Sequence, residues 1–315
     1  MARIPSKRLQ GAALKLLRQN LRLKRGERVA LVTDRKDCMV FVALDAAARQ
    51  LGASVSEAYL DPDRQNSAPV PAVGKLFMES DVIIAPTSKS ITHSPETIAA
   101  RKKAGARVAS MPGITEKMLI QAMSVDPRRI RTLHSRLRRH LQGANTVYVT
   151  TPSGTRLVVR MNDHQFAFND GGDIIRKGTV CNVPFGEVYA MIDDGNGAIA
   201  IDSWNRMIST ADKAVLHITD GKITRWSKGA LPYVRNQRKA GPCGSMIVEL
   251  GIGTNPAHKK PIGIVLHDEK IFGSVHVAFG GGGNIRKCAV HEDVILLRPT
   301  VMADGKVIIR DGKFV

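Results

Sequence analysis

Five side chains in the second half of this 315-residue chain have the chemistry of metal ligands and stand in apolar surroundings. They are Glu187 in NVPFGEVYAM (182–191), Glu249 in VELGIGTNP (248–256), His276 in SVHVAFGGGGN (274–284), and His291 with Asp293 in VHEDVILL (290–297). A carboxylate buried in such a run without a partner costs several kcal/mol, which a bound cation would offset. Imidazole and carboxylate groups are ordinary ligands of divalent transition metals. The pattern therefore predicts a metal site.

The spacing within HEDV supports one shared ion. On a strand, residues two apart point to the same side, so His291 and Asp293 can face one ion while Glu292 points away. Glycines occupy positions 280–283, shortly after His276, and glycine permits close approach of the backbone to a ligand.

Two ligand sets fit these residues. All five groups could hold two divalent ions (zinc, manganese or cobalt) roughly 3.5–4 Å apart, with a bridging carboxylate and an activated water for hydrolysis. Alternatively, His276, His291 and Asp293 alone could bind one Fe(II), because two histidines and one carboxylate form the facial triad of non-haem iron oxygenases.

The first half has the pattern of an α/β domain. Short β-rich apolar runs at 28–34, 54–60, 81–87 and 107–112 alternate with amphipathic segments at 6–24, 37–53, 70–79, 94–106 and 114–124. This alternation predicts a parallel sheet, with Ser6 and Ser94 as helix N-caps. Ligands of such sheets gather at the carboxyl ends of the strands. There the turn SKSITHSP (88–95) offers His93 as a candidate catalytic group.

Near Gly143 the pattern changes to strands and turns. We therefore expect an α/β Rossmann-like domain over 1–143 and a β-rich α+β metal-binding domain over 144–315, with a hairpin at 145–161 and a helix near 230–241. DGG (170–172) and HDEK (267–270) are among several turn signals in this part. No GxGxxG motif follows the apolar run 28–34, and no Walker-type motif is present. The predicted sheet alone therefore does not imply that a nucleotide binds.

Composition limits the remaining possibilities. The chain has 43% hydrophobic residues, no apolar run near the roughly 20 residues of a membrane span, and no secretory signal, so we expect a cytoplasmic protein. The net charge is +19, but only 4% of residues are aromatic, and the basic run 128–141 has the leucine spacing of a helix with its arginines exposed. Nucleic acid is therefore not the expected partner. The four cysteines form no CxxC pair, which argues against a disulfide framework and predicts buried thiols.

At these motifs the chain resembles the aminopeptidase T family of metallopeptidases. The likeness is carried by PSGTRL (152–157), NVPFGEV (182–188), ELGIGTNP (249–256), HVAFG (276–280) and HEDV (291–294). It implies a two-metal aminopeptidase acting on short peptides, often as a homodimer. By motif, the metal ligands would be Glu187, Glu249, His276, His291 and Asp293, with the neighbourhood of Glu187 also supplying the general base. Where the peptidases have a tyrosine seven residues after the motif histidine, this chain has Gly283.

The chain is also similar to 2,5-dihydroxypyridine 5,6-dioxygenase, which cleaves an aromatic ring with Fe(II). This likeness draws on His276, His291 and Asp293 and on the S-x-T-H turn that ends at His93. It implies that His93 is an acid/base group reaching the site from the first domain. A third possibility is a basic, non-enzymatic binding protein on a metalloenzyme scaffold, whose affinity would fall steeply with salt.

Overall fold

The computed structural model describes residues 4–205, 207–208, 213–283 and 285–315. The chain forms two compact units, residues 1–127 with 172–185 and residues 128–171 with 186–315. The first unit therefore ends 16 residues before the expected boundary at Gly143, and residues 172–185 return to it. The cause is visible in the pairing, because β8 (Val180–Asn182) adds to the sheet of the first unit beside β4 (Arg107–Ser110).

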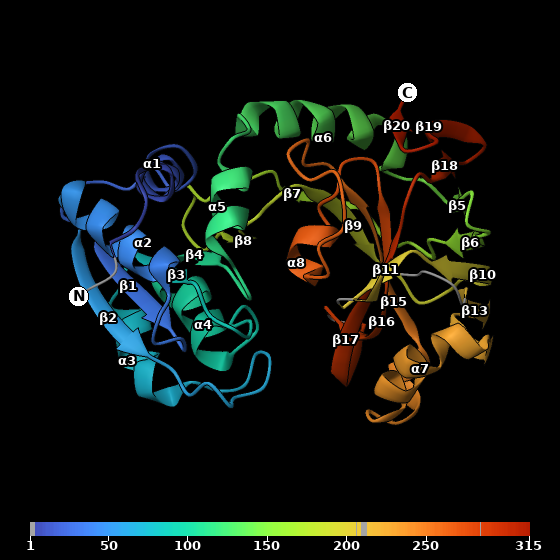
Figure 1. Cartoon of the computed structure of the whole chain (residues 1–315), viewed down its shortest axis with the longest axis horizontal. Coiled ribbons are helices and arrows are strands. Elements are labelled where there is room, and N and C mark those ends of the chain that lie inside the picture. Colours follow the sequence, from blue (N-terminus) through green and yellow to red (C-terminus); the bar gives the residue numbers. More distant parts are fainter. Residues whose placement is uncertain (1–3, 206, 209–212, 284) are drawn as a thin grey trace. The chain divides into compact units, whose positions relative to one another are not determined.

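The first unit is built on the predicted parallel sheet (Figure 1). Its strand order is β2-β1-β3-β4-β8, and each neighbouring pair is parallel. The remaining strands are β1 (Arg28–Thr33), β2 (Ser54–Tyr59) and β3 (Val82–Ala85). The helices are α1 (Lys7–Lys15), α2 (Met39–Gln50), α3 (Gly74–Met78), α4 (Pro95–Ala99) and α5 (Glu116–Ala122), with π-helical turns at Leu16–Asn20 and Ala100–Ala104 and a 3₁₀ turn at Pro71–Val73.

Two helices of this unit, α1 and α4, begin at the N-caps that the sequence predicts. The Ser6 hydroxyl accepts a hydrogen bond from the Leu9 amide, and the Ser94 hydroxyl accepts one from the Thr97 amide. Both side chains satisfy amide groups that the first helical turn leaves without partners. Contacts join α1, α2 and α5 into one group and α3 and α4 into another.

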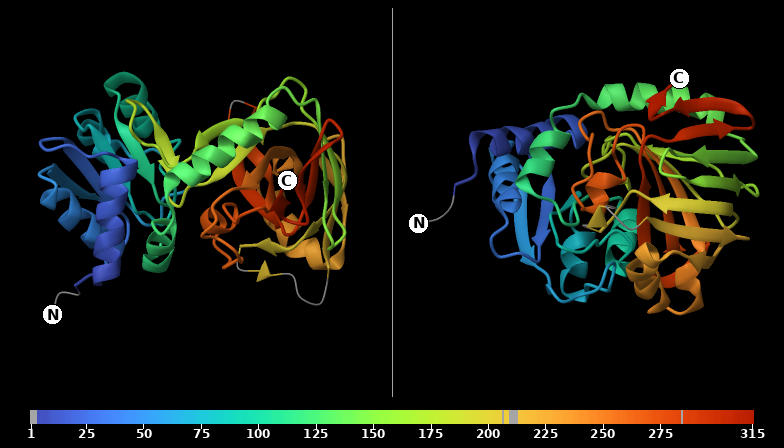
Figure 2. Two further views of the ribbon diagram at one scale, coloured as in Figure 1. Left: turned by 90° about the horizontal axis from the view of Figure 1, so that it is seen from above. Right: turned by 45° about the vertical axis from the view of Figure 1, so that its right-hand side comes forward.

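The second unit contains two antiparallel sheets (Figures 1 and 2). The first has the order β14-β13-β10-β6-β5-β18-β19-β20, and the second has the order β12-β11-β17-β16-β15-β9-β7. The strands of the first are β5 (Thr146–Thr150), β6 (Arg156–Arg160), β10 (Asn196–Ile201), β13 (Ala214–Thr219), β14 (Lys222–Trp226), β18 (Thr300–Ala303), β19 (Lys306–Arg310) and β20 (Lys313–Phe314). Those of the second are β7 (Ala167–Asp170), β9 (Glu187–Met191), β11 (Ser203–Trp204), β12 (Met207–Ile208), β15 (Ile247–Gly253), β16 (Val275–Gly282) and β17 (Arg286–Leu296).

In the described part of this unit, the sheets are accompanied by the helices α6 (Pro127–Leu141), α7 (Leu231–Arg238) and the short α8 (Val265–Asp268), with 3₁₀ turns at Lys228–Ala230 and Pro242–Ser245. The main core lies between the sheets and includes Val147, Leu157, Leu250, Val277 and Val294. From α6, Leu137 and Leu141 join this core, which confirms the apolar face predicted for the run 128–141.

The predicted fold class is confirmed at the level of a mixed α/β protein with one parallel sheet and further antiparallel sheets. Within the described part of the chain, no helix combines the length and the apolar composition that crossing a bilayer requires.

Candidate metal centre

One face of the β9–β15–β16–β17 sheet carries all five predicted ligands. Val188, Leu250, Val277 and Val294 on these strands belong to the core between the sheets. Because side chains alternate along a strand, the opposite face receives Glu187 from β9, Glu249 from β15, His276 from β16, and His291 with Asp293 from β17. The antiparallel register fixes these side chains relative to one another.

The five side chains form a continuous cluster. The Nε2 atom of His276 lies 3.3 Å from Glu187 Oε2 and 3.4 Å from Glu249 Oε1. The Nε2 atom of His291 lies 3.8 Å from Glu249 Oε2 and 3.6 Å from Asp293 Oδ2. Two groups result, Glu187–Glu249–His276 and Glu249–His291–Asp293, and in each one ligand atom per residue lies within 4.8 Å of the others. Glu249 belongs to both.

This grouping separates the three residues that a mononuclear site was expected to combine. His276 belongs to one group, whereas His291 and Asp293 belong to the other, and Glu249 contacts both imidazoles. Glu292 points away as predicted, because its Oε2 accepts a hydrogen bond of 3.0 Å from Trp204 Nε1.

Gly251 explains how the His276 ring reaches the cluster. Gly251 pairs with His276 across β15 and β16. A Cβ atom at Gly251 would lie 2.0 Å from His276 Nε2, so any side chain there would displace the ring. Gly251, the first glycine of VELGIG, therefore keeps the surface of β15 open for the imidazole.

The donor atoms fit a metal ion. Glu187 Oε2, His276 Nε2 and Asp293 Oδ1 are buried and have no hydrogen-bond partner among the described residues. Such orphaned polar atoms are costly unless a cation or water satisfies them. His291 is already oriented, because its Nδ1 donates to Gly281 O at 2.7 Å and leaves Nε2 facing the carboxylates. Metal-binding histidines are commonly held by such an outer hydrogen bond.

The cluster shifts the pKa values of its own members. Burial lowers the pKa of His291, but Asp293 and Glu249 outweigh that effect and raise it to about 9. Burial also opposes ionisation of Glu187, yet the Lys270 charge and the His276 imidazole, 3.3 Å away, lower its pKa to about 2. Without a metal, a proton on His291 therefore balances carboxylate charge, and a binding metal must displace it.

The local sequence does not single out three charged residues of this region, Lys270, Glu269 and Asp170. The fully buried Lys270 ammonium lies 2.5 Å from Glu187 Oε1, 2.9 Å from Glu269 Oε1 and 3.3 Å from Asp170 Oδ2. Asp170 and Lys270 stand in the turn signals DGG and HDEK, which are typical of exposed loops. A turn does follow α8 at Glu269–Lys270, but it is not an exposed one, since His267, Asp268 and Lys270 are buried.

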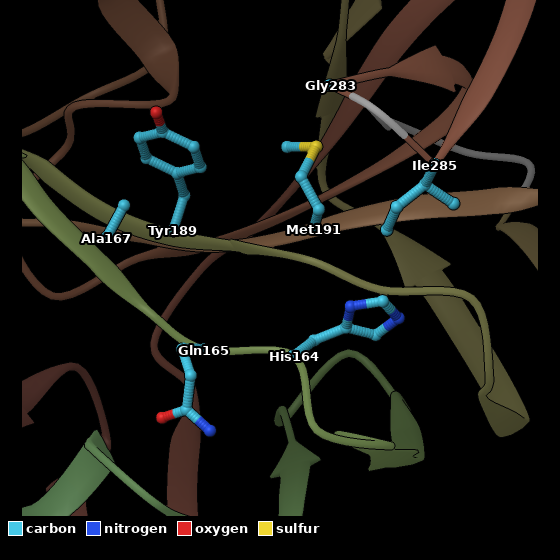
Figure 3. Close-up of a pocket in the computed structure, with 7 residues that line it drawn as sticks. All are labelled: His164, Gln165, Ala167, Tyr189, Met191, Gly283 and Ile285. Atoms are coloured by element: carbon cyan, nitrogen blue, oxygen red, sulfur yellow. The ribbon is translucent and has the colours of Figure 1, made fainter.

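A pocket of about 400 Å³ opens on the same face of the sheet (Figure 3). Ala167, Tyr189, Met191 and Ile285 lie along one side, and His164 and Gln165 lie along the other, with Gly283 at one end. The pocket adjoins the cluster, because Met191 pairs with Glu249 across β9 and β15. Tyr189 follows Glu187 by two residues, and burial together with the nearby carboxylates raises its pKa, so it stays a neutral hydrogen-bond donor.

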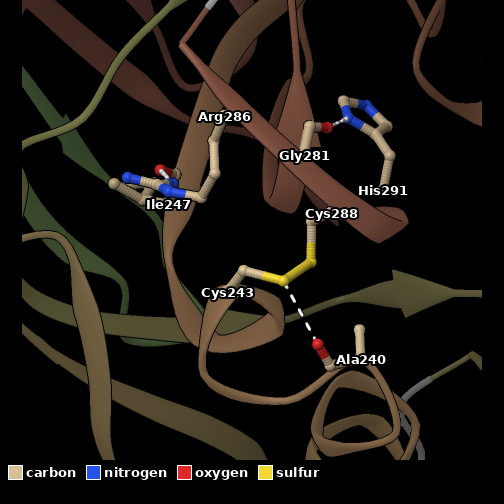
Figure 4. Close-up of a disulfide and its surroundings, with 7 residues drawn as sticks. All are labelled: Ala240, Cys243, Ile247, Gly281, Arg286, Cys288 and His291. Carbon is tan, nitrogen blue, oxygen red and sulfur yellow. Dashed lines mark hydrogen bonds between the residues drawn. A yellow bond between two sulfur atoms is a disulfide. The ribbon is translucent and has the colours of Figure 1, made fainter.

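The prediction of four buried thiols is wrong for two cysteines. Cys243 and Cys288 form a disulfide (Figure 4), whereas Cys38 and Cys181 are free and buried. The two partners are 45 residues apart, and the turn before β15 brings Cys243 to the start of β17. Because β17 also carries His291, the disulfide ties down one end of a ligand-bearing strand. Sequence spacing could not reveal this pairing, since it arises from the tertiary fold.

His93 belongs to the first unit. It lies exposed in the turn before α4, and its backbone amide donates to Ser67 Oγ at 3.3 Å. Its expected catalytic role stays a prediction.

The fold is shared with two kinds of solved enzyme structures. The 2,5-dihydroxypyridine dioxygenase of Pseudomonas putida KT2440 matches with a TM-score of 0.81 and 18% identity, over 99% of this chain and 98% of that one. Wild-type AmpT of Thermus thermophilus matches with a TM-score of 0.67 and 17% identity, over 98% of this chain and 99% of that one. Both resemblances noted in the sequence are therefore confirmed at the level of the fold.

The chain belongs to the NicX family, described as 2,5-dihydroxypyridine 5,6-dioxygenase, whose model matches residues 12–230. This range includes His93 and Glu187 and ends before Glu249. No curated protein sequence matches the chain.

Proposed function

We propose that this protein is an Fe(II)-dependent dioxygenase that cleaves a hydroxylated, pyridine-like aromatic ring. Membership of the 2,5-dihydroxypyridine 5,6-dioxygenase family is the observation that carries the proposal. The expectation of an aminopeptidase receives less support, because AmpT is the more distant of the two fold matches reported above.

The group Glu249–His291–Asp293 is suited to hold the iron. It supplies one imidazole and two carboxylates from two strands of one sheet face. This set differs from the expected triad of two histidines and one carboxylate, since Glu249 takes the place of His276, but three protein ligands would likewise leave coordination positions open for oxygen. A bound Fe(II) ion would supply the redox chemistry that ground-state O₂ needs. His276 would hold Glu249 in place through their contact of 3.4 Å.

The adjoining pocket fits the proposed substrate class. Its volume of about 400 Å³ lies in the range of small-molecule sites. Tyr189, Met191 and Ile285 offer apolar surface to a flat ring, and Gln165 and the Tyr189 hydroxyl offer polar groups to ring substituents. We expect the Tyr189 phenol, which stays protonated, to donate a hydrogen bond to an anionic ring oxygen.

Oxygen consumption tests this function. Protein loaded anaerobically with Fe(II) should consume one O₂ per molecule of 2,5-dihydroxypyridine, and His291→Ala should abolish consumption. Met191→Trp should narrow the pocket and raise KM while leaving the iron content unchanged. Folded, iron-loaded protein that consumes no oxygen with hydroxypyridines or catechols would refute the proposal.

A hydrolase of the aminopeptidase type is a second candidate, favoured by one specific observation. Glu249 is shared by two ligand groups, as a bridging carboxylate between two ions would be. This function would require two ions per chain and release of N-terminal residues from short peptides, and the resemblance would add a homodimer. Peptide hydrolysis lost in Glu249→Gln, together with a dimeric mass by light scattering, would favour it over the dioxygenase.

A further inference from the structure

Lys270 stands in an unusual position for a lysine. It follows α8 in the connection between β15 and β16, and its side chain is fully buried. Its ammonium group contacts the carboxylates of Glu187, Glu269 and Asp170. Lysine is almost never fully buried unless it is paired. Here three carboxylates surround the ammonium, so this buried position is suited to a cation.

The backbone fixes the position of Lys270. Its carbonyl accepts a hydrogen bond of 3.1 Å from the Asn255 amide, and its own amide donates to His267 O at 3.2 Å. A Cβ atom at Gly253 would lie 2.0 Å from Ile271 O and 2.8 Å from the Lys270 carbonyl carbon. Only glycine at 253 lets this connection pack directly on β15, so main-chain contacts hold the backbone of Lys270 on two sides.

Glu187 links Lys270 to the ligand cluster. Its Oε1 faces Lys270 at 2.5 Å, and its Oε2 faces His276 at 3.3 Å. A metal ion at the group Glu187–Glu249–His276 would have to share Glu187 with the ammonium, in a buried setting where like charges repel strongly. The group Glu249–His291–Asp293 has no such neighbouring ammonium among the ion pairs of the described residues.

We propose that the Lys270 ammonium occupies the role of a second cation beside Glu187, and thereby limits the centre to one divalent ion per chain. This inference rests on the proposed metal centre. Lys270 is a positioning residue in this account: it neutralises Glu187 and holds its carboxylate toward His276, while the ion binds at Glu249, His291 and Asp293.

Metal stoichiometry tests the inference. Purified protein is stripped with a chelator, loaded with Mn(II), freed of unbound metal and measured by inductively coupled plasma mass spectrometry. We expect one ion per chain for the wild type and two for Lys270→Met, in which Glu187 loses its fixed cation. Lys270→Arg should restore one ion, since it keeps the charge.

Arg64→Met is the matched control. It removes a buried cation that pairs with Asp34 at 3.3 Å in the first unit, and it should leave one ion per chain. A purely structural role of Lys270 would make Lys270→Met behave like this control. A folded Lys270→Met protein that still binds one ion would therefore overturn the inference.

If Lys270→Met does not fold, the number of ions that the wild-type protein binds can still overturn the inference. Calorimetric titration with Mn(II) should show one equivalent, and a second equivalent within tenfold of the first in affinity would overturn the inference. Oxygen uptake on the same samples separates the two proposals. One ion without dioxygenase activity would contradict the proposed function and agree with the one-ion limit, whereas absence of any bound metal would overturn both proposals.

Discussion

Nε2 of His276 lies 3.4 Å from Oε1 of Glu249, and this contact joins the two halves of the ligand cluster. The Glu249 carboxylate belongs both to the group that contains Glu187 and to the group that contains Asp293. The arrangement depends on Gly251, which leaves room for the imidazole above β15. Glu249 is therefore the residue on which the proposed metal centre would depend most.

Substitution of Glu249 should remove metal binding. Glu249→Gln keeps the shape of the side chain but loses the charge that both groups share, so we expect metal affinity to fall by more than the roughly 10–100-fold typical of an outer-shell substitution. Glu292→Gln is the control, because Glu292 lies on β17 between His291 and Asp293 but accepts a hydrogen bond from Trp204 instead of facing the cluster. Affinities come from competition with a chromogenic chelator, and equal values for the two variants would contradict the assignment.

Metal affinity should rise with pH. The pKa of His291 is raised to about 9 by Asp293 and Glu249 against the effect of burial, so at pH 7 only about one molecule in a hundred has the neutral imidazole that a metal requires. Affinity should increase about tenfold per pH unit between pH 7 and 9. Chelator competition at several pH values measures this slope. A flat profile would show that no proton is displaced from the cluster.

Acid should destabilise the second unit through His134. Burial lowers the pKa of this histidine to about 4 from its ordinary 6.5, and its Nε2 hydrogen-bonds to Thr254 Oγ1 at 2.8 Å. The unfolded chain gains a proton first as pH falls, so stability present above pH 6.5 is lost progressively down to pH 4. The loss amounts to about 3 kcal/mol. Urea unfolding at pH 7 and pH 4.5 should show a smaller pH dependence in His134→Gln, and an unchanged dependence would contradict this origin.

The disulfide should stabilise the hairpin that carries His291. A disulfide between residues 45 apart lowers the conformational entropy of the unfolded chain, which stabilises the folded state by about 4 kcal/mol. Denatured, unreduced protein should expose two thiols to a thiol reagent, and Cys243→Ser should lower the Tm. Cys181→Ser offers a comparison, since Cys181 is buried and unbridged. Four reactive thiols in the unreduced protein would exclude the bond.

The sequence predicts the elements of this protein better than their assembly. Caps such as Ser6 and the alternation of apolar runs identify most helices and strands, because these signals are local. The sequence singles out the candidate ligands because acidic and imidazole groups are conspicuous in apolar strands. Their grouping required the register of β9, β15, β16 and β17, which no single run contains.

Other features depend on contacts between distant segments. Lys270 stands in a turn-like HDEK run, and only the packing of that segment on Gly253 reveals that it is buried. Contacts between distant segments also produce the disulfide between Cys243 and Cys288 and the pairing of β8 with β4 in the first sheet. In each case the local sequence is compatible with an exposed loop or a free side chain, and tertiary contacts decide otherwise.

Isotope labelling tests the proposed reaction most directly. Fe(II)-loaded protein is given 2,5-dihydroxypyridine under ¹⁸O₂, and the product is analysed by mass spectrometry. A dioxygenase should place both labelled oxygen atoms in a ring-opened product and none from labelled water. An unlabelled product, or activity confined to peptide bonds with oxygen taken from water, would contradict the proposal and favour the hydrolase.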